Sequence, residues 1–133
     1  MSLSFDPSSV RLEAAHYIGG KTVPASGEIA LARPSDGKVF SECPIAGSEV
    51  VDQAVEAART AVKFSGWSVC HPRDRVKVMA AWADLVEGHA QELGQIEAVP
   101  STRLITEVVN GEIPVIAEQI RFFAELADKE GGF

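Results

Sequence analysis

Two cysteines and three histidines are the side chains of this sequence best suited to nucleophilic or metal chemistry. Cys70 precedes His71 and a proline-started helix, a position that modestly favours the thiolate. No oriented set of cysteine, base and carboxylate or amide is evident around Cys70 or around Cys43. His16, His71 and His89 lack the spacing of a metal site. We therefore predict no catalytic or metal-binding residue in the chain.

The segment Gly19-Gly20-Lys21 invites comparison with a phosphate-binding loop. Such a loop needs a fixed spacing between its glycines and a Gly-Lys pair at a helix N-terminus. Here strand-like segments flank the glycines on both sides, so we favour a tight β-hairpin turn. No G-x-G-x-x-G pattern occurs, and no carboxylate pair stands out for acid–base work. The sequence therefore predicts no self-contained dinucleotide site.

Composition narrows the class of partner. The 133 residues carry a net charge of −7, and their twelve basic residues are scattered, which argues against nucleic acid. No apolar run of about 18 residues is present, so we expect no membrane span. Two cysteines do not make a disulfide framework. We predict a cytoplasmic protein without nucleic-acid or membrane partners.

Hydrophobic periodicity predicts an α+β fold. Residues 1–15 are expected to form an irregular arm, residues 16–46 a small β hairpin or meander, and residues 47–133 three to four helices. The "PSDG" segment at 34–37 is typical of a turn between two strands. The change from alternating to helical spacing at Gly47 marks the boundary between the two regions.

The helical region divides at its caps and prolines. We expect Ser48 to cap the first helix, Pro72 to begin a second helix that continues past Gly88, and Pro100 to end it. A short helix is expected at 105–109 and the last one from about Glu112. The predicted apolar face of the first helix is made of Val51, Ala54, Val55, Ala58, Ala61 and Val62. The predicted inner side of the last helix is made of Ile113, Ile116, Ala117, Ile120, Phe123, Ala124 and Ala127.

Large aromatic residues are divided between core and surface. We expect Trp67, Trp82 and Phe123 to pack in the core, and Phe122 to lie off the inner face as a candidate for an interface. After the last helix, Gly131-Gly132 is expected to form the turn into a further strand that begins at Phe133.

A set of short motifs in fixed order carries a resemblance to a known family. They are "YIGGK", "PASGE", the "PSDG" turn before "VFSECPIA", "DQAVEAARTA", "GW" before a proline-started helix, "ADLVEGHAQEL" and "RFFAELADK". Over roughly residues 16–132 the chain resembles the N-terminal part of NAD(P)-dependent aldehyde dehydrogenases. One departure is "PSTRL" at 100–104, where relatives often have D-T-G-K-P.

The resemblance implies a role without catalysis for these residues. In the family, the nucleophilic cysteine, the general-base glutamate, the oxyanion-hole asparagine and the nicotinamide-binding glycines all lie downstream of this segment. The chain alone is thus expected to bind no cofactor, whereas the full-length family uses NAD or NADP. The resemblance places Gly111 and Val115 near the mouth of the aldehyde channel.

Two functions of different class follow. In the first, the chain is the N-terminal segment of a truncated aldehyde dehydrogenase, an oxidoreductase that converts aldehydes to acids. In the alternative, it is a non-catalytic, self-associating interaction or structural module derived from that scaffold. In both, apolar helix faces without a sheet to cover them predict a homo-oligomer, or a complex with the remainder of an aldehyde dehydrogenase.

Overall fold

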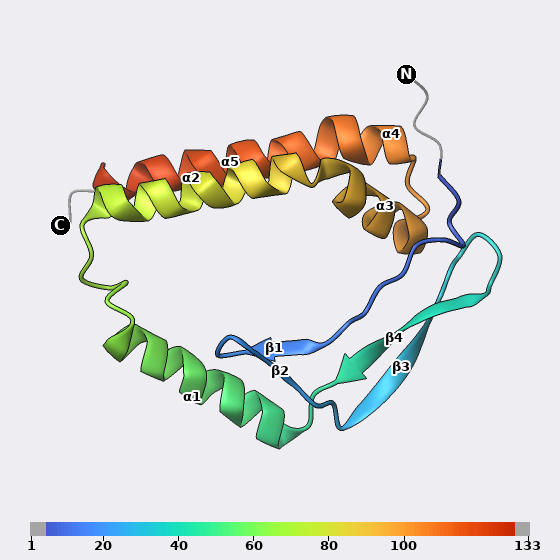
Figure 1. Cartoon of the computed structure of the whole chain (residues 1–133), viewed down its shortest axis with the longest axis horizontal. Helices are drawn as coiled ribbons and strands as arrows, with labels where there is room; N and C mark the ends of the chain where they lie inside the picture. Colours follow the sequence, from blue (N-terminus) through green and yellow to red (C-terminus); the bar gives the residue numbers. More distant parts are fainter. Residues whose placement is uncertain (1–4, 130–133) are drawn as a thin grey trace. The chain divides into compact units, whose positions relative to one another are not determined.

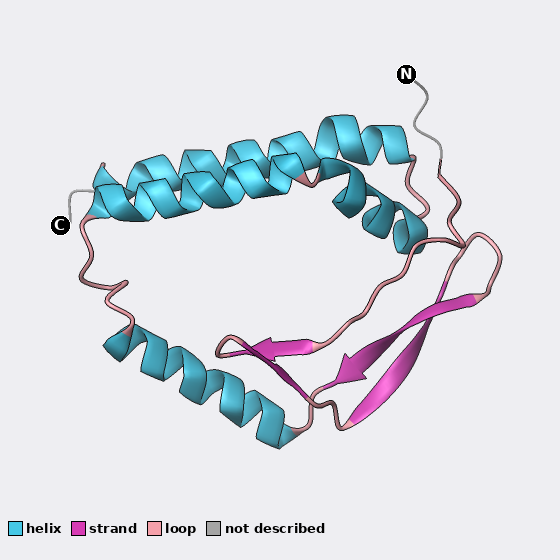
Figure 2. Cartoon of the chain, viewed as in Figure 1, coloured by secondary structure: helices cyan, strands magenta, loops and turns pink. Residues whose placement is uncertain are grey.

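The computed structural model describes residues 5–129 (Figure 1). Short antiparallel strands come first and helices follow, which is the predicted α+β order (Figure 2). Its described residues form two compact units, residues 10–69 and residues 70–129 together with 5–9. The expected turn and strand at residues 131–133 lie outside the described residues. No helix among the described residues is long and apolar enough to cross a bilayer.

The first hairpin of the 10–69 unit joins β1 (His16–Ile18) to β2 (Lys21–Val23). Its two turn residues are Gly19 and Gly20, with φ of 59° and 81°. Positive φ at both central positions is the geometry of a type I′ turn, which glycine adopts without a steric penalty. The predicted tight hairpin at these glycines is confirmed.

The second hairpin joins β3 (Gly27–Ala32) to β4 (Val39–Ile45) through the "PSDG" turn. Arg33, which directly follows β3, is 8% exposed. Its Nε and Nη2 donate hydrogen bonds to the Asp36 carboxylate at 3.1 and 2.7 Å. This paired guanidinium, helped by the backbone N–H of Lys38, holds the pKa of Asp36 below its usual value. The expected turn at 34–37 is therefore stabilised by hydrogen bonds from its flanking residues to Asp36.

The helix α1 (Ser48–Phe64) completes this unit. Gly47 is its N-cap, and Ser48 is the first helical residue, so the prediction that Ser48 caps the helix is wrong by one position. The extended backbone of Gly47 brings its carbonyl to the N–H groups of Val50 and Val51. No residue of α1 is buried, so its predicted apolar face lies open.

In the second unit, α2 (Pro72–Gly88) and α3 (Ala90–Ser101) are separate helices. The prediction of one continuous apolar face past Gly88 is wrong, because the backbone at His89 leaves helical geometry and α3 starts in a new direction. The prediction that Pro100 ends the helix is also wrong. The proline lies in the last turn of α3, which ends at Ser101.

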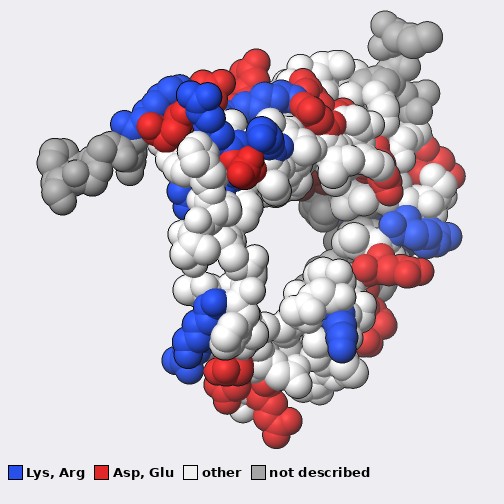
Figure 3. Space-filling view, turned by 60° about the vertical axis from the view of Figure 1, so that its left-hand side comes forward, with Lys and Arg blue, Asp and Glu red and all other residues white. Residues whose placement is uncertain are grey.

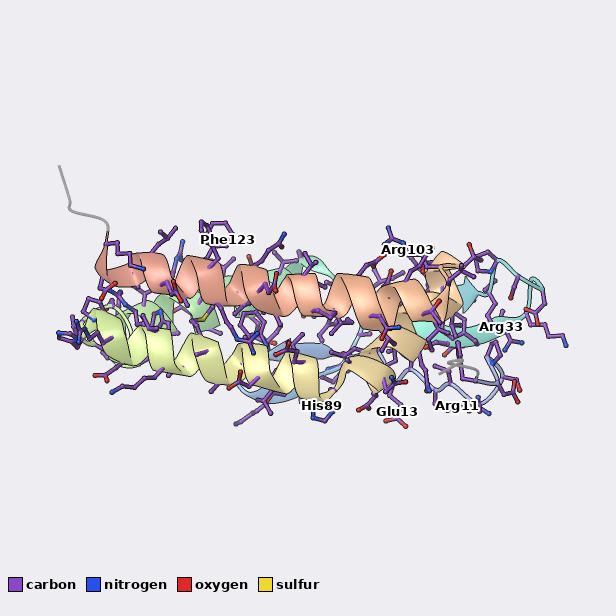
Figure 4. All side chains as sticks on the ribbon, turned by 90° about the horizontal axis from the view of Figure 1, so that it is seen from above. Arg11, Glu13, Arg33, His89, Arg103 and Phe123 are labelled. Carbon is purple, nitrogen blue, oxygen red and sulfur yellow. The ribbon has the colours of Figure 1, made fainter. Side chains whose placement is uncertain are left out.

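A single helical stretch closes the fold. It consists of α4 (Ile105–Glu107), η1 (Val108–Glu112), α5 (Ile113–Glu125) and η2 (Leu126–Asp128). The predicted start at residue 105 is confirmed, and α5 begins at Ile113, next to the predicted Glu112. The expected gap between a short helix at 105–109 and the last helix is wrong, because η1 joins α4 to α5 without a break. Figures 1 and 4 show α5 running beside α2 along most of its length.

Small residues form the contact between α2 and α5. Ala83 and Ala117 are fully buried and Ala124 is 5% exposed, so the two backbones approach closely. Larger side chains lie on other faces: Phe123 is 65% exposed and projects away from α2 (Figure 4), and Trp82 is 51% exposed. The prediction that these aromatics are core residues is therefore wrong for this chain. Also exposed, against expectation, are Trp67 and Ile116, whereas Phe122 is exposed as expected.

We expect Gly94→Ala to lower the free energy of unfolding by about 1–3 kcal/mol, the usual cost of overpacking. A Cβ at Gly94 would overlap with Cγ2 of the buried Val109, so the Val109 side chain or one of the two helices must shift. Urea denaturation measures the loss. Gly88→Ala is the matched control, since a Cβ there meets no atom within 4 Å. Equal stabilities of the two variants would contradict this account of the α3–η1 contact.

Candidate functional site

The two residues expected at the channel edge lie on one exposed helix face. Gly111 belongs to η1, where the N–H of Ile113 donates to the carbonyl of Val108 in the wide π-helical pattern. Val115 follows four residues later and thus shares the face of Gly111. It is 49% exposed, and a Cβ built at Gly111 meets no heavy atom within 4 Å. Both positions are therefore open to solvent.

The opposite side of the same stretch is firmly packed. Val108 is fully buried, and Val109 and Ile113 are each 6% exposed. An ion pair between Arg103 and Glu112 also ties η1 to the loop before α4 (Arg103 is labelled in Figure 4). Single π turns in helices occur frequently at functional sites. Gly111 and Val115 carry no acid, base or nucleophile, so this face could shape a passage but not perform chemistry.

The loop that leads into this stretch has an unusual backbone. Thr102, directly after α3, takes the left-handed conformation with φ of 57°. The neighbouring Ser101 supports the turn, because its hydroxyl donates to the Glu97 carbonyl at 2.6 Å and accepts from the N–H of Arg103 at 3.3 Å. A β-branched residue is rare at such φ. By the resemblance to aldehyde dehydrogenases, Thr102 of "PSTRL" stands where relatives often have the glycine of D-T-G-K-P.

The two cysteines lie in different units of the fold. Cys43 lies on β4 in one unit and Cys70 precedes α2 in the other, and they form no disulfide. His71 caps α2, its Nδ1 accepting from the N–H of Arg73 at 3.2 Å. Nδ1 of His71 therefore serves as the N-terminal cap of α2. Within residues 5–129 no group of three or more histidine, cysteine or acidic side chains could hold a metal ion.

Sequence reasoning missed one carboxylate pair. Glu28 on β3 and Glu42 on β4 occupy one face of the hairpin as diagonal neighbours, since the register pairs Glu28 with Pro44 and Ala30 with Glu42. A hydrogen bond to Glu42 and the repulsion between the charges raise the pKa of Glu28. The period-2 spacing around the predicted turn could have indicated this neighbourhood.

The pair borders an open cavity of about 540 Å³. Glu13 joins the two carboxylates in its lining, together with Leu12, Ala14, Val39, Phe40 and Ser41. The hydroxyl of Ser41 is committed, because it donates to the carbonyl of Leu12. The cavity is therefore bordered by interacting carboxylates, and we assign it no catalytic role.

Comparison with known proteins adds the family. The model of the "aldehyde dehydrogenase family" matches residues 22–132, which is most of the chain. The chain belongs to the aldehyde dehydrogenase family. This confirms the resemblance on which the channel-edge expectation rests, whereas the positions of Gly111 and Val115 at a channel stay predictions.

Curated relatives show the same segment within longer proteins. The 2-aminomuconic semialdehyde dehydrogenase of Danio rerio is 43% identical over 109 residues, which is 82% of this chain and 22% of that protein. The putative aldehyde dehydrogenase DhaS of Bacillus subtilis is 35% identical over 118 residues, covering 87% of this chain and 24% of its own. The chain thus spans about a quarter or less of these relatives.

Solved structures agree on the fold. The gamma-glutamyl-gamma-aminobutyraldehyde dehydrogenase of Burkholderia cenocepacia superimposes with a TM-score of 0.87 at 31% identity, covering 96% of this chain and 26% of that one. An NAD-dependent aldehyde dehydrogenase of Sinorhizobium meliloti gives a TM-score of 0.87 at 27% identity, covering 95% and 26%. The fold is that of the N-terminal part of these enzymes.

We expect Thr102→Gly to raise the free energy of unfolding by about 0.5–1 kcal/mol. Glycine removes the steric cost of the left-handed backbone, roughly 1–2 kcal/mol for other residues. Part of this stabilisation is lost, because glycine has more conformational entropy in the unfolded chain. Urea denaturation measures the change. The control is Thr106→Gly in α4, which should destabilise by about 0.3–0.5 kcal/mol, because that position is helical and glycine is a weaker helix former than threonine. Destabilisation by both variants would contradict a strained Thr102.

We expect Glu42→Gln to raise the melting temperature at about pH 7 and to have little effect well below the ordinary glutamate pKa of about 4.3. The folded state raises the pKa of Glu28, so it binds a proton more tightly than the unfolded chain does. The folded protein therefore loses stability as pH rises from the ordinary glutamate pKa through the raised pKa of Glu28. Glu42→Gln removes the negative charge that causes this loss. Thermal melts across this range test it.

The control for this pair is Glu97→Gln, an exposed glutamate on α3. It removes the same charge from the chain without removing a carboxylate from the hairpin. A gain at neutral pH that is equal in both variants would show that net charge, and not the Glu28–Glu42 pair, is responsible.

Proposed function

We propose that this chain is the N-terminal portion of an NAD(P)-dependent aldehyde dehydrogenase, an oxidoreductase that converts an aldehyde to an acid. The observation that carries the proposal is the family match over residues 22–132. The chain supplies scaffold to the cofactor domain, and the exposed η1–α5 face supplies one side of the aldehyde entrance through Gly111 and Val115.

Cofactor binding belongs, in this proposal, to the rest of the enzyme. NAD or NADP, when bound there, accepts the hydride of the aldehyde. The Gly-Gly pair of this chain is a hairpin turn between two strands and not a loop at a helix N-terminus, so it does not fit a pyrophosphate. We therefore derive no step through the cofactor here and propose that the chain alone is inactive.

Partners and location follow from the same proposal. The chain associates with the remainder of an aldehyde dehydrogenase or with a second copy of itself, and not with nucleic acid or membranes. The exposed valines of α1 support a protein partner, since an apolar helix face gains free energy when it is covered. We propose a cytoplasmic location, in keeping with a human relative named cytosolic 10-formyltetrahydrofolate dehydrogenase, which is 31% identical over 134 aligned residues.

A chimaera tests the proposal. Residues 22–132 replace the matching segment of the Danio rerio relative, and we expect a folded enzyme that reduces NAD(P) with the parent's aldehyde. In it, Val115→Trp should raise KM for the aldehyde about tenfold with a smaller change in kcat, because a bulky residue at the entrance hinders binding more than chemistry. The control is Gln91→Trp, at an exposed position of α3.

Three outcomes would contradict parts of this proposal. A folded but inactive chimaera, with an active parent, would overturn the assignment of these residues to the enzyme. Equal KM values for the Val115→Trp and Gln91→Trp variants would overturn the channel-edge role. Formation of NAD(P)H by the 133-residue chain alone would overturn its proposed inactivity.

A further inference from the structure

An asparagine followed by a glycine lies in η1, and both residues are exposed. Asn110 is the only asparagine of the chain, and its side chain forms no hydrogen bond within the described residues 5–129. A Cβ built at the adjacent Gly111 meets no heavy atom within 4 Å. The Asn110 amide and the peptide that joins it to Gly111 are therefore accessible to water.

An asparagine side chain can react with the main-chain nitrogen of the residue that follows it. That nitrogen attacks Cγ, the bond between Cγ and Nδ2 breaks, and ammonia leaves with the proton of the attacking nitrogen. Water then opens the resulting succinimide ring at either of its carbonyl groups, which gives aspartate or isoaspartate, and no oxidant or reductant takes part. A following glycine favours this route, because it has no Cβ beside the nitrogen and reaches more backbone conformations than other residues.

The π-helical turn is the weak point of the backbone at this position. The attack requires Asn110 to leave helical geometry, so that its peptide with Gly111 can rotate. In η1 the N–H of Ile113 donates to the carbonyl of Val108, five residues back, a pattern that helices rarely use. A glycine inside the turn weakens it further, since glycine loses the most conformational freedom in a helix. The rotation takes place on the exposed side, so the buried Val109 can keep its contacts.

A second sequence of this type, Asp36-Gly37, is held by its hairpin. Aspartate forms the same ring with loss of water, chiefly from the protonated carboxyl group. Arg33 and the N–H of Lys38 donate hydrogen bonds to the Asp36 carboxylate and hold its pKa below the usual value, so the group stays ionised. The N–H of Gly37 donates to the carbonyl of Arg33 at 2.8 Å. Both reacting groups are therefore bound at Asp36, whereas the side-chain amide of Asn110 is not.

We propose that Asn110 is a site of spontaneous deamidation in this chain, reached through local opening of η1 while the rest of the unit stays folded. The product adds one negative charge to a chain with 19 acidic and 12 basic residues. Acidic and basic side chains already lie side by side over the helices at the top of Figure 3. Isoaspartate also adds a methylene group to the main chain. The reaction depends on the backbone around Asn110 and not on the proposed function.

Mass spectrometry and peptide mapping of the whole chain, incubated at mildly alkaline pH, test the site. Deamidation replaces NH by O, and methylation by an isoaspartyl methyltransferase marks isoaspartate. We expect conversion at Asn110, with aspartate and isoaspartate as products, and no isoaspartate at Asp36. Asn110→Gln should show no conversion over the same time, because its longer side chain places the amide carbon farther from the attacking nitrogen.

A glycine substitution tests which nitrogen attacks. We expect Gly111→Ala to slow the reaction about tenfold, which corresponds to a barrier higher by about 1.4 kcal/mol. The matched control is Gly88→Ala at the end of α2, where a Cβ also meets no atom within 4 Å, and it should react at the wild-type rate. Circular dichroism shows whether each variant keeps its helices. Equal rates in these two variants would overturn attack from residue 111.

A peptide of residues 107–113 gives the rate of the fully open sequence in the same buffer. If the reaction needed complete unfolding, the chain would react at the peptide rate multiplied by the unfolding equilibrium constant, which urea denaturation measures. We expect the chain to react at least about tenfold faster than this limit, because η1 opens locally. A rate equal to the limit would overturn local opening. A chain that stays intact while the peptide is fully converted would overturn the site itself.

Discussion

The uncovered apolar face of α1 is the constraint on which the behaviour of this chain depends. The two halves of the molecule differ in this respect: α2 and α5 bury their alanines against each other, whereas every residue of α1 keeps contact with solvent. Apolar area left in water costs about 25 cal/mol per Å². An amphipathic helix of this kind gains most of its stability from a surface that covers it. That surface belongs, in our account, to the remainder of an aldehyde dehydrogenase or to a second copy.

Around the candidate channel edge the constraint is close packing, whereas at α1 it is the lack of a covering surface. Gly94 admits no side chain beside Val109, and the π turn of η1 places Gly111 on the outside while Val108 is fully buried. Thr102 holds a left-handed backbone just before this stretch. In the proposed enzyme, this close packing would hold the shape of the face that carries Gly111.

The sequence predicted the features that local chemistry decides. Gly19-Gly20 and the "PSDG" turn specify their hairpins through φ and side-chain hydrogen bonds, and the period of the apolar residues placed most helices. It failed where a tertiary contact decides. Phe123 has the spacing of a core residue, but α2 meets the alanines beside it, and the break at His89 has no proline to announce it. The channel-edge role of Gly111 and Val115 was predicted from the resemblance alone, because neither residue has an acidic, basic or nucleophilic group.

Amide hydrogen exchange most directly tests the claim that α1 lacks its partner surface in this chain. It compares the 133-residue protein, diluted until it is monomeric, with the same segment inside a full-length aldehyde dehydrogenase chimaera. We expect the amides of α1 to exchange much faster in the isolated chain, and those of α5 facing α2 to change far less. Equal protection of α1 in both proteins would contradict the account.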